Sequence, residues 1–204
     1  MGSTRPRHGP RPVRLRKGTP RPNGNGSEDC EVSRRLPKPP HIPRAVSQPL
    51  SAISDENVEQ AIADYAFQKL EGKSDREREI VNGFSPGVRA LFVTWVVEGE
   101  VNNGGFNQYY WNTSGQYAGE ADKAFEFFGA KKHAELMREA NRIHSEEAAT
   151  MEEYRKRGTL QDFSDSYKAT KLGPLDERFY RIDENLSALR LAKIRSSPAL
   201  FSGN

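Results

Sequence analysis

Apolar residues recur every three or four positions from residue 54 onward, and glycines, asparagines and prolines interrupt this pattern repeatedly. Such spacing places apolar side chains on one face of a helix, so it predicts helices rather than strands. The most apolar segment begins at Ser85-Pro86, an N-cap residue followed by a proline in the first helical turn. It ends at the breaker cluster of residues 102–105, and we expect this helix to form the centre of the core.

The full pattern predicts an all-α fold, a compact bundle of about six helices in one domain over residues 51–204. Residues 159–174 are expected to be irregular, and the alternation around Phe163 and Tyr167 is the only hint of a strand. The C-terminal pair Leu200-Phe201 is expected to dock back on the domain. Besides the central helix, the predicted helical segments are residues 54–71, 74–82, 106–111, 120–128, 130–157 and 176–195.

Residues 1–50 differ from the rest of the chain in composition. They hold 11 Lys and Arg but 3 Asp and Glu, giving +8, whereas residues 51–204 hold 20 and 25, giving −5. Arg, Pro, Gly and Ser dominate this segment, which cannot bury enough apolar surface to offset the entropy of ordering, so we predict a disordered basic tail. Its arginines can bind nucleic-acid phosphates without reading sequence, although a solvated charge run is the interpretation we favour. Translation from a later start, at Val32 or Val46, is a further alternative.

Composition excludes several classes of protein and site. The mean hydropathy is −0.82 and no apolar run approaches the roughly 20 residues that span a membrane, so we expect no membrane association and a cytoplasmic location. Cys30 is the only cysteine, which excludes an intrachain disulfide and a cysteine-based zinc site. His133 and His144 share a helix face, but eleven residues apart is not a known zinc spacing. We therefore expect no metal and no cofactor.

Residues 98–112 combine carboxylates, amides, a glycine pair and aromatic residues, which suggests an enzyme of unknown type as one interpretation. Glu98 and Glu100 would then act as acid and base, but residues two apart on a helix point to different sides. The chain contains no serine-nucleophile motif and no phosphate-binding glycine loop, so we assign no catalytic residue. In the enzyme interpretation, a pocket would be surrounded by five residues: Glu98, Glu100, Asn102, Gln108 and Tyr109.

A structural interpretation of the same segment is the one we favour. Asn102 and Asn103 would close the central helix, and Gly104 and Gly105 would supply positive φ angles. The aromatic residues would fill the core, while the amides and a carboxylate would join the turn by hydrogen bonds.

The segment also resembles the signature of a bacterial domain family that is catalogued largely as of unknown function and named after a DNA-mimic protein. The similarity covers about residues 53–201 and includes the lead-in Phe84-Ser85-Pro86 and the closing Pro198-Ala199-Leu200-Phe201. The resembling run is Gly99-Glu100-Val101-Asn102-Asn103-Gly104-Gly105-Phe106-x-Gln108-Tyr109, followed by Asn112-x-Ser114-Gly115. We expect the residues of this signature to support the fold rather than to bind or catalyse. They are Glu100, Asn102, Asn103, Gly104, Gly105, Phe106, Gln108, Tyr109 and Asn112.

The resemblance implies an all-helical fold. For the named member it also implies a dimer whose acidic surface occupies the DNA-binding site of a transcriptional regulator. Rows of carboxylates can imitate the charge of DNA. The segment 130–157 offers one such row, although interspersed Lys and Arg also fit an ordinary solvated helix face. The carboxylates of this row are Glu135, Glu139, Glu146 and Glu153.

We therefore favour a non-enzymatic protein-interaction domain, a DNA mimic that binds the DNA-binding surface of a transcriptional regulator and forms a homodimer. Two alternatives stay open. One is an enzyme that uses residues 98–112, and the other is nucleic-acid association through the basic tail.

Overall fold

The computed structural model describes residues 49–202. The predicted tail, with Cys30, lies outside this range apart from residues 49 and 50. Within the described residues the chain is all-helical, with nine α-helices, three short 3-10 helices and no strand. The predicted fold class is therefore confirmed, whereas the predicted number of about six helices is too low.

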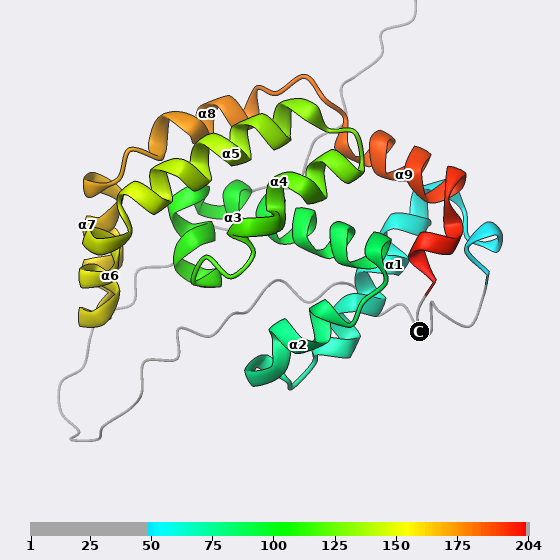
Figure 1. Cartoon of the computed structure of the whole chain (residues 1–204), viewed down its shortest axis with the longest axis horizontal. Coiled ribbons are helices and arrows are strands. Elements are labelled where there is room, and N and C mark those ends of the chain that lie inside the picture. The colour runs from blue at the N-terminus through cyan, green and yellow to red at the C-terminus, as the bar shows by residue number, and fades with distance from the viewer. Residues whose placement is uncertain (1–48, 203–204) are drawn as a thin grey trace, which may run out of the picture. The chain divides into compact units, whose positions relative to one another are not determined.

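Helix α3 lies at the centre, with α1, α4 and α8 packed against it, and α5 packs on α4 (Figure 1). No helix within residues 49–202 is long and apolar enough to cross a membrane. The helices are η1 (Leu50–Ala52), α1 (Asp55–Leu70), η2 (Ser74–Arg76), α2 (Glu77–Asn82), α3 (Pro86–Thr113), α4 (Ala118–Phe127), α5 (Lys131–Glu146), α6 (Ala148–Arg157), α7 (Leu160–Ala169), α8 (Gly173–Tyr180), α9 (Leu186–Ser196) and η3 (Pro198–Phe201).

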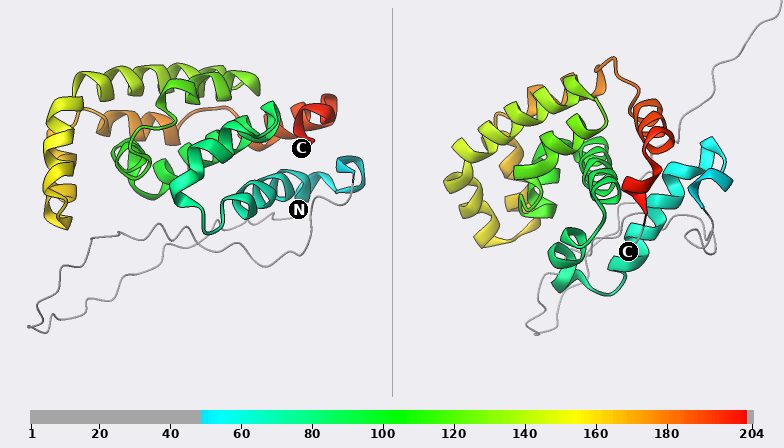
Figure 2. Two further views of the ribbon diagram at one scale, coloured as in Figure 1. Left: turned by 60° about the horizontal axis from the view of Figure 1, so that its bottom comes forward. Right: turned by 45° about the vertical axis from the view of Figure 1, so that its right-hand side comes forward.

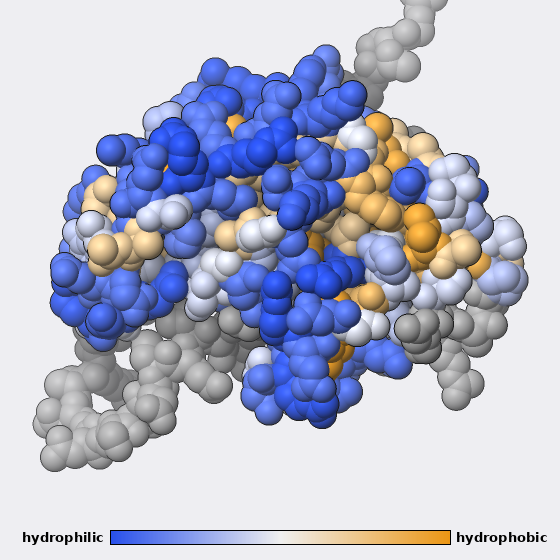
Figure 3. Space-filling view, viewed as in Figure 1, coloured by the Kyte–Doolittle hydropathy of each residue, from blue (hydrophilic) through white to orange (hydrophobic). Residues whose placement is uncertain are grey.

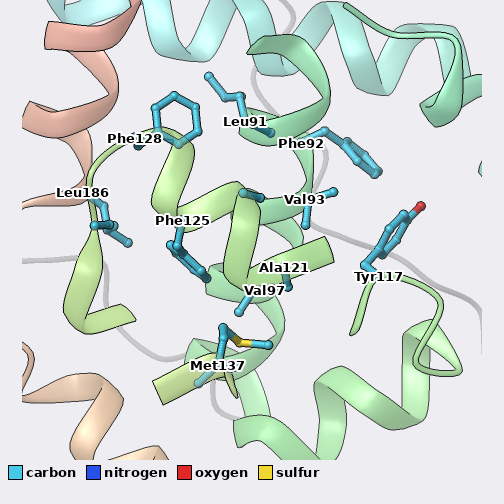
Figure 4. Packing of buried hydrophobic residues seen from close by; sticks show 14 of the residues in the cluster. Leu91, Phe92, Val93, Val97, Tyr117, Ala121, Phe125, Phe128, Met137 and Leu186 are labelled. Atoms are coloured by element: carbon cyan, nitrogen blue, oxygen red, sulfur yellow. The ribbon is translucent and has the colours of Figure 1, made fainter. Parts of the chain in front are cut away.

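The core forms around α3, as the sequence predicts. The side chain of Val97 on α3 lies close to Met137 of α5, and Val93 and Phe125 of α4 are buried in the same cluster (Figure 4). Phe201 is buried, and the predicted docking of the C-terminus is therefore confirmed. Its ring contacts the rings of Phe127 and Phe128, and the backbone of Gly87 is so close that a β-carbon there would overlap it.

The single long helix predicted over residues 130–157 is wrong. Helix α5 ends at Glu146, and α6 begins at Ala148 and leaves in a different direction (Figure 2). The apolar face of α5 stops at Ile143, because residues 144–150 contain no large aliphatic side chain. The bend is joined to the α7–α8 connection, since the Glu147 carboxylate accepts hydrogen bonds from the Thr170 hydroxyl at 2.6 Å and the Lys171 N–H at 2.9 Å.

The predicted last helix, residues 176–195, is likewise two helices. The chain turns between α8 and α9, where the Asn185 side chain accepts from the Ala188 N–H at 3.0 Å and caps α9. Gly173-Pro174 opens α8, because proline is tolerated in the first turn of a helix.

Residues 159–174 are mostly helical, with only residues 170–172 connecting α7 to α8, and the strand hint around Phe163 and Tyr167 is wrong. Helix α7 begins with a capping box, in which Thr159 and Asp162 exchange side-chain-to-backbone hydrogen bonds.

Candidate functional site

The candidate site is a kink in α3, at the glycine pair of the signature segment. Gly104 (φ −160°, ψ 25°) and Gly105 (φ 77°, ψ −179°) have non-helical backbones, and the helix resumes at Phe106. Gly105 has the predicted positive φ that favours glycine, whereas the prediction for Gly104 is wrong because its φ is extended. A β-carbon on Gly105 would also overlap the carboxylate of Asp176, which packs directly on its α-carbon.

The backbone groups that the kink separates find partners on α7 and α8. The Tyr180 hydroxyl donates to the carbonyl of Val101 at 2.7 Å, and the Tyr167 hydroxyl donates to the carbonyl of Gly104 at 2.9 Å. The N–H of Phe106 donates to Oδ1 of Asp176 at 2.8 Å. Three side chains distant in sequence therefore replace hydrogen bonds that an unbroken helix would make for itself.

A second set of hydrogen bonds bridges the kink from within α3. Oε2 of Glu100, before the kink, accepts from Nε2 of Gln108 and from Nδ2 of Asn112, each at 2.8 Å. After the kink, Nδ2 of Asn107 donates to Oγ of Ser166 on α7 at 2.8 Å. The hydrogen bonds between amides and a carboxylate that the structural interpretation expects are thus present. Asn102 and Asn103 are exposed at the end of the first half of α3.

Burial and negative charge set the electrostatics of the kink. Burial raises the pKa of Asp176 above its ordinary value, and the hydrogen bond from the Phe106 N–H offsets part of this effect. Burial, with the nearby carboxylates of Asp176 and Glu100, raises the pKa of Tyr167 to about 12. Within residues 49–202, Asp176 and Glu100 form no ion pair with a basic side chain.

The residues of the enzyme interpretation point to different places. Glu98 accepts a hydrogen bond from Nη1 of the buried Arg190 at 2.8 Å, on a side of α3 away from Glu100. Glu98 and Asn102 line an open pocket of about 360 Å³ whose lining includes neither Glu100 nor Gln108. Tyr109 is fully buried. Across the described residues no group of three or more His, Cys, Asp or Glu side chains gathers in a way that could hold a metal ion.

The predicted acidic row does not lie on one helix, because Glu153 falls on α6, beyond the bend. Glu139 forms an ion pair with Arg178 at 2.6 Å, and Glu146 forms one with Arg142 at 2.6 Å. Glu135 and Glu153 are exposed and form no ion pair within the part of the chain that the structure describes. The surface over α5 is hydrophilic (Figure 3), but basic side chains interrupt its negative charge.

Comparison with known proteins places the chain in a family. A family model described as "DMP19-like protein" matches residues 82–196, which is more than half of the chain. The chain belongs to the DMP19-like family. The resemblance noted from the signature segment is therefore confirmed, and this family takes its name from a DNA-mimic protein. No curated protein and no solved structure matches the chain.

The DMP19-like match contains the whole kink and the three side chains that complete it. Sequence reasoning missed these side chains, Tyr167, Asp176 and Tyr180, and it also missed Arg190. The hydrogen bonds that define their roles join residues 63 to 131 positions apart. No local pattern marks such contacts, although Asp176 and Tyr180 are one helical turn apart on α8 and so share a face.

The charge of the DMP19-like region is nearly balanced. Residues 82–196 carry 17 acidic and 16 basic side chains, and residues 131–157 alone carry six and seven. The acidic excess lies before the match, because residues 55–79 carry eight acidic and four basic side chains. The negative potential on the surface of the DMP19-like region therefore comes from local groups of unpaired carboxylates rather than from its net charge.

Proposed function

We propose that this chain is a DNA mimic that binds the basic, DNA-binding surface of a partner protein, such as a transcriptional regulator. The family match over residues 82–196 is the observation that carries the proposal. The arrangement of the signature segment supports it, because the Glu100 carboxylate accepts hydrogen bonds from the amides of Gln108 and Asn112 within the same helix. Surface carboxylates are then the groups left to bind a partner.

Carboxylates without an ion-pair partner should contribute most to binding of the basic partner. A carboxylate already paired with an arginine presents little net charge to a partner, so Glu139 and Glu146 should matter less than Glu135 and Glu153. The proposal therefore ranks the four carboxylates of the acidic row, and this ranking can be tested.

The test is an affinity capture from a lysate of the source cell, with the full chain as bait, at low and at high salt. We expect a basic DNA-binding protein to be retained at low salt and lost at high salt, because counterions screen exposed charges. The purified partner should then bind either its DNA or this chain, but not both. Capture of no basic protein at either salt would contradict the proposal.

Charge-reversal variants locate the surface. Glu135→Lys with Glu153→Lys should weaken partner binding strongly, whereas Glu139→Lys with Glu146→Lys, an equal change of charge, should weaken it less. The matched control is Glu56→Lys with Glu71→Lys, two exposed carboxylates on the α1 side that lie outside the family match. If Glu135→Lys with Glu153→Lys and the control variant weaken partner binding equally, binding depends only on the net charge of the chain.

The homodimer implied by the family resemblance remains a proposal, which light scattering of the purified chain would test. Nucleic-acid association through residues 1–50 also stays a prediction. It requires an affinity for DNA or RNA that disappears when those residues are removed.

A further inference from the structure

The tyrosines at the α3 kink are oriented in an unusual way. The side chains of Tyr180 and Tyr167 are 54% and 38% exposed, yet their hydroxyls are turned inward onto the carbonyls of Val101 and Gly104. A tyrosine on a protein surface commonly buries its apolar ring and keeps its hydroxyl near water. Here both residues stay partly exposed although their hydroxyls are bound, and the Tyr167 ring packs edge-on against Phe163 at 5.2 Å between ring centroids. Exposed aromatic surface is the feature expected of a surface that a partner covers.

A carboxylate lies beside these rings. Asp176 is one turn before Tyr180 on α8, and its Oδ1 accepts from the N–H of Phe106. Its Oδ2 lies against Gly105 and has no hydrogen-bond or ion-pair partner among the described residues. The neighbouring arginines of α8 do not neutralise it. Arg178 is paired with Glu139 at 2.6 Å, and Arg181 with Glu177 at 3.0 Å.

We propose that the kink patch, formed by Tyr167, Asp176 and Tyr180 over residues 101–106, docks an arginine side chain of a basic protein partner. A guanidinium is planar, so it can stack on an aromatic ring while donating hydrogen bonds to a carboxylate. The patch offers two exposed rings, a carboxylate oxygen without a partner and no basic side chain of its own. A lysine fits less well, because its compact ammonium cannot stack in this way.

This inference rests on the proposed function and adds a location to it. The partner's DNA-binding surface would supply the arginine, since such surfaces contact phosphates largely through arginine and lysine. The docking point would then lie on α3, α7 and α8, and the unpaired carboxylates of α5 and α6 would attract the same basic surface over a longer range. Because residues 82–196 are nearly neutral, an aromatic anchor of this kind can give affinity that net charge does not.

The two tyrosines have another role, which is to satisfy the carbonyls of the kink, and the variants must separate the two roles. Tyr180→Phe removes the hydroxyl and keeps the ring, whereas Tyr180→Leu removes the ring as well. If the ring docks a guanidinium, Tyr180→Phe keeps binding and Tyr180→Leu loses it. If the tyrosine only supports the kink, both variants lower the stability equally and leave binding unchanged.

The experiment is titration of the full chain with an octa-arginine peptide, with octa-lysine as the comparison probe, followed by NMR and by calorimetry. We expect the largest shifts at Tyr167, Asp176 and Tyr180, tighter binding of octa-arginine than of octa-lysine, and about a tenfold loss of octa-arginine affinity in Tyr180→Leu. Asp176→Asn should also weaken binding. Leu160→Ser is the matched control, because Leu160 is 72% exposed on α7 and lies outside the kink patch.

The outcomes separate this inference from the proposed function. Octa-arginine binding that survives Tyr180→Leu but is lost in Glu135→Lys with Glu153→Lys would overturn the kink patch and keep the DNA mimic. Equal weakening by Leu160→Ser would also overturn the kink patch. No binding of octa-arginine to the wild-type chain would count against both.

Discussion

Gly105 is the residue that allows the two halves of α3 to meet at an angle. Its φ of 77° is costly for any residue with a side chain, and the Asp176 carboxylate fills the space that a β-carbon would need. We expect Gly105→Ala to lower the free energy of unfolding by about 2–4 kcal/mol, from backbone strain and overpacking together. Urea denaturation of the full chain measures this change.

Gly99 provides the control for that substitution. It lies on the exposed side of the same helix, and a β-carbon there would meet nothing within 4 Å. Gly99→Ala should therefore raise the stability by about 0.5–1 kcal/mol through helix propensity. Similar losses at both glycines would mean that neither the positive φ nor the contact with Asp176 is important.

Glu184 stabilises the start of α5, and its effect should depend on pH. Its carboxylate accepts from the N–H groups of Lys132 at 3.0 Å and His133 at 3.1 Å, and it pairs with Nδ1 of His133 at 2.8 Å. Burial alone would raise the pKa of Glu184, but these hydrogen bonds outweigh burial and hold the pKa below its ordinary value of 4.5. The stabilisation is thus fully present above pH 4.5 and is lost as the pH falls through the lowered pKa.

The corresponding variant is Glu184→Gln, which removes the charge and keeps the shape. At pH 7 this variant should lower the free energy of unfolding by about 1 kcal/mol, as the loss of a charged cap at a helix N-terminus does. The difference from the wild type should shrink when urea denaturation is repeated at decreasing pH below 4.5. Asp183→Asn is the control, and a difference for Glu184→Gln that stays constant with pH would exclude this explanation.

At the scale of elements, the α6–α7 pair depends on its own contacts more than on the core. The two helices pack mainly on each other, and Met151 and Ser166 are their buried residues. We expect Thr159→Ala, which removes the capping box, to cost about 1 kcal/mol. Amide hydrogen exchange should accelerate in α7 while exchange in α3 stays unchanged.

Thr150 serves as the control for the cap, since it is an exposed threonine within α6 and caps nothing. Thr150→Ala should leave exchange in α7 unchanged. Faster exchange throughout the chain in Thr159→Ala would show that α7 unfolds together with the core rather than by itself.

The elements also show why only part of this structure could be predicted from the sequence. The periodicity of residues 86–102 and the glycine pair that follows it are local signals, and they correctly placed the core helix and the break after it, although the helix resumes at Phe106 and runs to Thr113. The bend at Glu147 is different, because residues on both sides favour helix and the bend depends on contacts with Thr170 and Lys171. Helix α7 was missed because Gly158 before it and Gly173-Pro174 after it are breaker signals, although Thr159 and Asp162 form a capping box at its start.

The candidate site could be predicted even less completely. Glu100 and Gln108 are eight residues apart on either side of a visible breaker, so their hydrogen bond was within reach of the sequence. The partners of the kink on α7 and α8 could not be predicted from the sequence. Amphipathic periodicity shows that a residue faces inward, but it does not show which backbone group that residue contacts.

In the whole molecule, Arg190 joins three helices that are far apart in the sequence. Its side chain is 2% exposed on α9, and Nη1 donates to Glu59 of α1 and to Glu98 of α3, each at 2.8 Å. Nε1 of Trp95 also donates to Glu59, at 2.7 Å. The contact thus connects α1, which lies outside the family match, to the DMP19-like region.

Loss of Arg190 should lower the stability strongly because it leaves two carboxylates without a cation. In Arg190→Met the carboxylates of Glu59 and Glu98 lose their only cation among the described residues, and Glu59 is mostly buried. We expect a loss of about 3–5 kcal/mol, which is typical when one partner of a buried ion pair is removed. Arg181→Met, at an exposed pair with Glu177, should change the stability by less than about 0.5 kcal/mol.

Two explanations of the stability lost in Arg190→Met can be separated: loss of the attraction between Arg190 and the two glutamates, or the burden of leaving their carboxylates unpaired. The combined variant Arg190→Met, Glu59→Gln and Glu98→Gln decides between them. Nε and Nη2 of Arg190 are buried without a hydrogen-bond partner, so the native ion pair already carries a desolvation cost. We therefore expect the neutral triple variant to recover most of the stability that Arg190→Met loses, measured by urea denaturation. If the triple variant is as unstable as Arg190→Met, the attraction itself holds α9 to α1 and α3. Recovery would instead mean that apolar packing, around residues such as Ile194 and Val97, holds these helices together and that Arg190 serves to neutralise the two carboxylates.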